Sequence, residues 1–228
     1  MHTDKGYLLS YLKYSDKDAI LHVFTFSEGY QSYYLRGAYA PNSKKKAYLS
    51  PLNELQLTVR PSKRNATLKQ LSTLEGLDSI DWSENIKASC VVFFVADFLN
   101  QILREESQNP SLYHEITKCS SELSQGNFQS HLIFLARILE IQGFYPLVNE
   151  HPYLDPEAGA FVQRQTHHLF HKDLSDLYRQ ILLSESPYEL KIPTSKRKEF
   201  LETLMIYYQY HHANFKVPRS LEIVKELF

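Results

Sequence analysis

The stretch Glu54–Arg60, ELQLTVR, alternates strictly between apolar and polar residues: Leu55, Leu57 and Val59 are apolar, and the positions between them are polar. A period of two predicts a β-strand with one face in a core and the other in solvent. A strand of this kind needs neighbouring strands to cover its edges, so the sequence around it is where the rest of the sheet is expected.

Four further short apolar segments lie between residues 6 and 77, with turn residues between them: YLLSYLKYS, AILHVFTFS, YQSYYLRGAY and ATLKQLSTLEGL. Asp16–Asp18 forms one polar turn, and Gly29 can take the positive φ that another turn requires. Five strands in this space leave no room for long helices. They predict a small antiparallel barrel, since closure removes exposed edges, and a five-stranded Greek-key barrel of this size is commonly an OB-fold.

The pattern becomes helical after Leu77. Asp81 or Ser83 is a candidate N-cap for a helix that continues to about Glu106. Apolar residues cover most of its circumference, which predicts a central buried helix. Its apolar positions include Ile86, Cys90, Val91, Phe93, Phe94, Val95, Phe98 and Ile102.

Further helices are predicted downstream, the first beginning at Pro110 and the next ending at Gly143. A loop-rich insert at about 144–172 contains the short hairpin YLDPEAGAFV, and three more helical segments follow it: DLSDLYRQILLSE, SKRKEFLETLMIYYQYHHANF and SLEIVKEL. The predicted fold class is therefore α+β, with an OB-fold barrel in residues 1–80 and an α-helical domain in residues 81–228.

Charge is distributed unevenly along a chain whose net charge is −1. Residues 1–80 contain 11 Lys and Arg against 7 acids, whereas the remainder contains 14 against 19. A basic first third suggests an anionic partner. No P-loop, dinucleotide-binding fingerprint, Gly-x-Ser-x-Gly or His-Glu-x-x-His occurs, so the sequence nominates no enzymatic site.

Lys44, Lys45 and Lys46 form the densest positive charge, between two predicted barrel strands. Barrel loops of OB-folds bind oligonucleotides, and lysines beside aromatic residues are what single-strand binding requires. A solvated turn is the alternative for the lysines, and a barrel-wall position is the alternative for Tyr34. The predicted DNA-binding residues are Lys13, Tyr34, Arg36, Lys44, Lys45, Lys46, Arg60, Lys63, Arg64 and Lys69.

Four histidines fall in the insert region: His151, His167, His168 and His171. A specific metal site is one interpretation, but no cysteine or carboxylate completes a familiar ligand spacing, so surface histidines are the preferred one. Charges interrupt the first residues, which therefore show no signal-peptide pattern, and the longest apolar run has seven residues. We therefore expect a protein of the cytoplasm that does not enter a membrane.

The order of these features resembles the RecO family of bacterial recombination mediators. The similarity is carried by Gly6, Asp16–Asp18, Ile20-Leu21, Phe24-Thr25, Gly29 and Gly37-Ala38, then by LSPLNELQLTV, and at the end by YYQYHHANFKVPRSLEIVKEL. The resemblance implies an OB-fold joined to a helical domain. It also implies a nucleoid-associated protein that binds single- and double-stranded DNA, anneals complementary strands and works with RecR to load recombinase on DNA coated by single-strand-binding protein.

The resemblance also implies that the helical domain binds the acidic C-terminal tail of single-strand-binding protein, an interaction for which Phe94, Phe98, Arg104 and Arg137 are the candidates. Many family members carry a four-cysteine zinc module in the insert, whereas residues 144–172 here contain no cysteine. No metal or other cofactor is therefore expected. Two rival functions remain: a helical adaptor whose barrel binds protein, and, more remotely, a histidine-based metal hydrolase in the insert.

Overall fold

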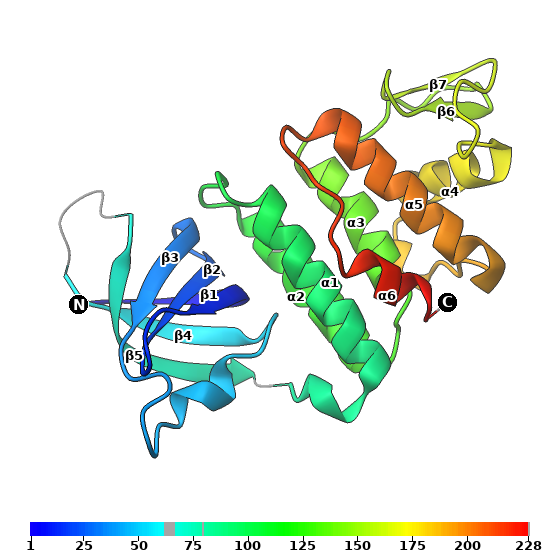
Figure 1. The fold of residues 1–228 in the computed structure, drawn as a ribbon. Helices are drawn as coiled ribbons and strands as arrows, with labels where there is room; N and C mark the ends of the chain where they lie inside the picture. The colour runs from blue at the N-terminus through cyan, green and yellow to red at the C-terminus, as the bar shows by residue number, and fades with distance from the viewer. Residues whose placement is uncertain (62–66, 79, 228) are drawn as a thin grey trace. The chain divides into compact units, whose positions relative to one another are not determined.

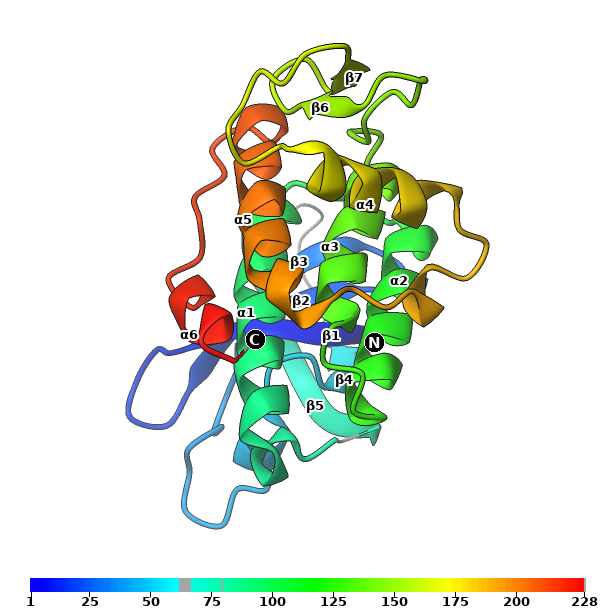
Figure 2. The same cartoon turned by 90° about the vertical axis from the view of Figure 1, so that its right-hand side faces the viewer.

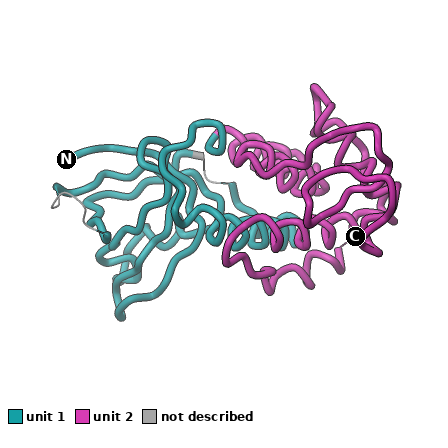
Figure 3. The backbone as a smooth tube through the Cα atoms, turned by 90° about the horizontal axis from the view of Figure 1, so that it is seen from above, with its two compact units in different colours: residues 1–113 teal, residues 114–228 magenta. Residues whose placement is uncertain are grey.

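The computed structural model of the protein describes residues 1–61, 67–78 and 80–227. It divides into two compact units, Met1–Tyr113 and His114–Phe228, which Figure 3 distinguishes by colour. Two predicted DNA-binding residues, Lys63 and Arg64, lie outside the described residues. The predicted domain boundary between residues 80 and 81 lies after the last barrel strand. That the two domains are separated there stays a prediction.

The first unit contains a closed five-stranded barrel (Figure 1). Its strands are β1 (His2–Lys13), β2 (Ala19–Thr25), β3 (Gly29–Leu35), β4 (Glu54–Val59) and β5 (Lys69–Asp78), in the order β1-β2-β3-β5-β4. This closed five-stranded barrel has the architecture of the predicted OB-fold. The alternation in β4 also has its expected consequence, because Leu55, Leu57 and Val59 are buried in the barrel core.

The predicted antiparallel pairing is correct for four of the five strand pairs and wrong at the fifth, the parallel pair β3–β5 that closes the barrel. This parallel pair aligns only Tyr33 with Lys69 and Tyr34 with Gln70, whereas β2 and β3 are paired along seven positions. The connection between β3 and β4 contains a short 3-10 helix, η1 (Lys45–Tyr48), so the lysine run lies partly in a helical turn.

Helix α1 (Ile86–Ile102) belongs to the same unit as the barrel. Its N-cap is Asn85, whose side-chain oxygen accepts a hydrogen bond from the Ala88 N–H. The prediction of Asp81 or Ser83 as the N-cap was wrong, because Asp81 caps the preceding turn η2 (Trp82–Glu84), which contains Ser83. Most of the apolar positions predicted for this helix are buried, but two of them are exposed. Ile86 and Phe93 are 77% and 56% exposed.

Two close contacts join the barrel to the segment that follows α1. Gly29 (φ +74°) lies so close to the backbone of Glu106 and Ser107 that a Cβ there would be 2.4 Å from their atoms. The adjacent Tyr30 N–H donates to the Glu106 carbonyl at 3.0 Å. At the start of the next helix, the buried Tyr113 ring packs against Tyr7 with centroids 5.0 Å apart.

The remaining helices are α2 (Pro110–Ser124), α3 (Ser130–Ile141), α4 (Lys172–Leu183), α5 (Thr194–His211) and α6 (Leu221–Lys225), with a turn η3 (Pro187–Glu189). Helix α2 begins in the first unit and continues in the second. In the second unit α3 packs against α4 and α5 (Figure 2), and its residues from Leu132 to Ala136 are fully buried. Across the described residues, no helix combines the length and apolar character that crossing a bilayer requires.

The insert forms the predicted hairpin, β6 (Tyr153–Asp155) and β7 (Ala160–Val162). Helices α4 and α5 hold it from two sides. His211 donates a ring N–H to the Pro156 carbonyl at 2.7 Å, and Ser175 Oγ accepts the Leu154 N–H at 2.9 Å. The Arg179 guanidinium lies 4.2 Å from the centre of the Phe161 ring and bonds the His151 carbonyl at 2.5 Å. Packing and hydrogen bonds thus anchor this cysteine-free segment.

Candidate nucleic-acid interface

The outer surface of β1, β2 and β3 carries an apolar and aromatic patch. The register places Leu12 beside Ile20 and Ile20 beside Tyr34 across the three strands. Tyr14 follows the end of β1, and its ring meets that of Tyr34 edge to face at 6.0 Å. Tyr14 and Leu12 are 65% and 59% exposed, so their side chains are open to a ligand. We call Leu12, Tyr14, Ile20 and Tyr34 the aromatic patch.

The β1–β2 turn that supports this patch is built around Asp18. Its carboxylate accepts the Tyr34 hydroxyl at 2.6 Å and the Gly37 N–H at 2.8 Å. These hydrogen bonds lower the pKa of Asp18, while the bond to the carboxylate raises the pKa of Tyr34. Gly37 (φ +69°) takes a conformation that glycine adopts without strain. The turn and the end of β3 therefore hold the Tyr34 ring in place.

Several predicted cations gather at this end of the barrel. Arg36, the first residue after β3, is exposed, as are Lys44 and Lys46. Lys45 differs, because its ammonium donates to the Arg36 carbonyl at 2.8 Å. Lys13 extends over the Tyr39 ring at 5.9 Å. The structure thus brings Tyr34, Arg36 and the lysine run to one end of β3.

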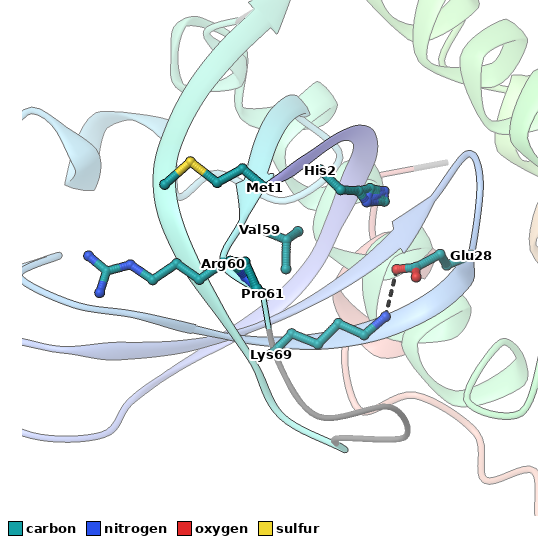
Figure 4. Close-up of a pocket in the computed structure, with 7 residues that line it drawn as sticks. All are labelled: Met1, His2, Glu28, Val59, Arg60, Pro61 and Lys69. Carbon is teal, nitrogen blue, oxygen red and sulfur yellow. Dashed lines mark hydrogen bonds and ion pairs between the residues drawn. The ribbon is translucent and has the colours of Figure 1, made fainter.

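Arg60 and Lys69 lie apart from that group, on a cleft of about 230 Å³ (Figure 4). The cleft is lined by Met1, His2, Glu28, Val59, Arg60, Pro61 and Lys69. Lys69 pairs with Glu28 at 2.6 Å, near the start of β3, whereas Arg36 follows its end. The Lys69 side chain lies on the inward side of β5, the side of the core residue Leu71, whereas Arg36 and the lysine run lie beside the outer face of β2 and β3. In OB-folds this face, together with the β1–β2 and β4–β5 loops, binds oligonucleotides.

The same outer face is covered where α1 ends. The Tyr30 hydroxyl donates to Asn100 at 2.9 Å, and the His22 ring stacks on Tyr30 with centroids 5.8 Å apart. Burial lowers the pKa of His22, and the nearby charge of Arg104 lowers it further. Arg104 is exposed at this position and adds a cation to the outer face. The RecO resemblance had assigned this arginine to tail binding instead.

Comparison with known proteins agrees with this architecture. The family model described as "Recombination protein O N terminal" matches residues 1–80. The "DNA repair protein RecO" of Flavobacterium johnsoniae is 31% identical over 242 residues, which cover 98% of this chain and 98% of that protein. The chain belongs to the RecO family. Proteins of the same name from Phocaeicola vulgatus and Flavobacterium psychrophilum are 30% and 28% identical and cover 98% of this chain.

A likeness to the solved Entamoeba histolytica asparaginyl-tRNA synthetase has a TM-score of 0.29 at 16% identity, over 67% of this chain and 35% of that one. It supports no inference. The RecO relatives, in contrast, match across both units, and each is covered over almost its whole length.

The residues that the RecO resemblance nominated for tail binding have different environments. Phe94 and Phe98 are fully buried in α1 and present no surface. Arg137, in the second unit, pairs with Glu140 and lies 3.9 Å from Glu115, with its side chain partly exposed. Only the two arginines, Arg104 and Arg137, are thus placed to meet a ligand.

The insert histidines contact their own surroundings. The rings of His167 and His168 stack with their centroids 4.7 Å apart, and His171 Nε2 lies 3.6 Å from a carboxylate oxygen of Glu199. Among the described residues, the metal-compatible cluster of His, Cys, Asp and Glu side chains occurs elsewhere, at His2, Asp4 and Glu28.

Sequence reasoning missed Tyr14, Leu12 and Arg104 as members of the interface. Tyr14 follows the last residue of a strand, where a two-residue period no longer assigns a face. Arg104 follows a helix that is distant in the sequence. The one available signal was the tyrosine next to Lys13 in a turn of a predicted OB barrel.

Proposed function

We propose that this protein is a non-enzymatic recombination mediator that binds single- and double-stranded DNA and anneals complementary strands. In this proposal it helps to load recombinase onto DNA coated by single-strand-binding protein, together with RecR. The observation that carries the proposal is the exposed aromatic patch on the oligonucleotide-binding face of an OB barrel, with Arg36, Lys44 and Lys46 near the end of β3.

Each part of the patch has a physical role in this proposal. The Tyr14 and Tyr34 rings stack on bases, an interaction that tolerates any sequence because every base has a π-face. Arg36, Lys44 and Lys46 neutralise phosphates, which provides affinity without sequence information. Arg60, which is exposed at the end of β4, extends this contact toward the β4–β5 loop, and Arg104 adds a cation beside the covered part of the face. Lys69 is left out of this contact because its ammonium is paired with Glu28.

The test is a fluorescence assay of annealing between complementary oligonucleotides coated with cognate single-strand-binding protein. The mediator should accelerate annealing, and its affinity for bare single strands should fall steeply as salt rises. An adaptor whose barrel binds only protein would show weak DNA binding at every salt concentration. That result, with no acceleration of annealing, would contradict the proposal.

We further propose that the C-terminal tail of single-strand-binding protein binds through Arg137 in the second unit, with Arg104 as the rival site in the first. A tail carboxylate would replace Glu140 as the partner of the Arg137 guanidinium. Calorimetry with the tail peptide should show binding that Arg137→Ala weakens and that Arg179→Ala, a control at another ion pair, leaves unchanged. Loss of binding in Arg104→Ala alone would move the site to the first unit.

Folding without a metal ion belongs to the same proposal. The insert contacts through His211, Arg179 and Ser175 support it, because they hold the hairpin from α4 and α5. Chelator treatment should leave the protein folded, whereas loss of a structural zinc would remove much of the folding free energy. A cooperative loss of structure on chelation would contradict it.

A further inference from the structure

A second polar cluster lies at the start of β1, away from the aromatic patch, and two of its three members line the cleft. One ligand atom from each of His2, Asp4 and Glu28 lies within 4.8 Å of the others. Ligands of a single zinc-like ion are separated by roughly 3–4 Å, because metal–ligand bonds are about 2 Å long. Small side-chain movements would therefore bring the imidazole and the two carboxylates onto one ion. Figure 4 shows His2 and Glu28 on this cleft.

One buried polar atom of this cluster finds no hydrogen-bond partner among the described residues. Asp4 is only 7% exposed, and its Oδ1 accepts the Lys5 N–H while its Oδ2 accepts nothing.

An unsatisfied buried carboxylate oxygen is costly, and buried charges are normally paired or bound to a metal. Strand register explains why Asp4 is in this position: it pairs with the inward-facing Leu57 and so points toward the barrel interior. An apolar residue would suit that position if packing were its only role. A cation held between Asp4, Glu28 and His2 would satisfy the free oxygen.

We propose that His2, Asp4 and Glu28 form a binding site for a divalent transition-metal ion of the Mn²⁺ or Zn²⁺ class. Imidazole favours Zn²⁺ and related ions, while carboxylates suit Mn²⁺ as well, so the mixed ligand set fits this class. Two of the three ligands, His2 and Glu28, line an open cleft, which leaves coordination positions for water or another oxygen ligand. The site departs from the sequence-based expectation of no metal, and it is separate from the insert in which some family members carry zinc.

Lys69 sets the strength of this site. Its ammonium already bonds one oxygen of Glu28, Oε2, at 2.6 Å, which leaves Oε1 for the ion. The positive charge of Lys69 repels a second cation, so removing it should tighten metal binding. A nonspecific surface site elsewhere would not respond to this substitution.

The experiment titrates Mn²⁺ into the chelator-treated full chain, without a terminal histidine tag, and follows free Mn²⁺ by electron paramagnetic resonance with Zn²⁺ as competitor. We expect one saturable ion per chain. Asp4→Asn and His2→Ala should each lower the affinity at least about 10-fold, the lower end of what loss of an outer-shell partner costs. Lys69→Gln should raise the affinity, and Asp16→Asn, an exposed acid in the β1–β2 turn, should leave it unchanged.

No saturable binding below about 1 mM, the weak end of known protein cation sites, would overturn the inference. Binding that persists in both His2→Ala and Asp4→Asn would also overturn it, since the ion would then lie elsewhere, for example on the insert histidines. His2 is exposed, so its variant keeps the test valid if Asp4→Asn impairs folding. The assay contains no DNA, and its outcome is therefore independent of the proposed mediator function.

Discussion

Replacing Tyr14 with alanine should weaken single-strand binding without affecting the fold. Tyr14 is 65% exposed, and its ring contact is the edge of Tyr34 at 6.0 Å. An exposed substitution of this kind usually changes the free energy of unfolding by about 0.5 kcal/mol or less. The loss of one stacked base, in contrast, costs about 1–3 kcal/mol of binding free energy. The dissociation constant should therefore rise by about 5- to 150-fold.

The assay is fluorescence anisotropy with a labelled oligonucleotide over a series of salt concentrations. Because the substitution removes no charge, the line of log affinity against log salt should shift down with its slope unchanged. Tyr14→Trp keeps an aromatic face and should bind at least as well as the native chain. Tyr210→Ala is the matched control, since Tyr210 is 50% exposed on α5 in the second unit.

Two results would refute this reasoning. Affinity within twofold of the native chain at every salt concentration would show that Tyr14 contacts no base. A change of slope would show that the substitution disturbed the neighbouring cations, in which case the loss could not be assigned to stacking.

Three further predictions test the barrel and the core. Replacing Lys44 and Lys46 together with alanine should reduce the salt slope for single strands by about 1.4 units if both contact phosphate, and an unchanged slope would restore the solvated-turn interpretation. Gly37→Ala should cost about 1 kcal/mol of stability in urea unfolding, because φ is +69° but the nearest atom is 3.9 Å away. Gly29→Ala should cost about 1–3 kcal/mol more, since its Cβ would meet backbone at 2.4 Å, and equal losses would contradict the close approach. Burial lowers the pKa of His131 from 6.5 to about 4, so between these pH values the unfolded chain binds more protons than the folded chain. The free energy of unfolding should therefore fall by up to about 3 kcal/mol as the pH drops from 7 to 4, and urea unfolding of His131→Phe should lack this contribution.

The barrel could be predicted from local pattern because its strands follow the simplest rule. Leu55, Leu57 and Val59 alternate in sequence and are buried in the core, so periodicity alone assigns their face. Helix α1 shows where the rule fails. Ile86 and Phe93 are as apolar as their buried neighbours, and hydropathy could not indicate that their side of the helix is exposed.

The candidate site was less predictable because its members come from separate segments. Lys45 resembled its two neighbours in sequence, yet its ammonium bonds the Arg36 carbonyl while theirs stay exposed. Asp4 is a polar residue that only the register of β1 turns toward the interior. Contacts of this kind depend on strand pairing and side-chain reach, which composition and spacing do not specify.

The short seam between β3 and β5 has a consequence for the motions of the barrel. The seam aligns only two residues on each strand, so it should be the first ladder of the barrel to separate. The amides bonded across the seam should exchange with deuterium earlier than the amides bonded between β2 and β3, which are paired along seven positions. Tyr34 lies both on this seam and in the aromatic patch. A nucleic acid that stacks on Tyr34 would hold β3 and β5 together. Slower deuterium exchange of the amides in the seam would therefore indicate that a nucleic acid is bound on the outer face.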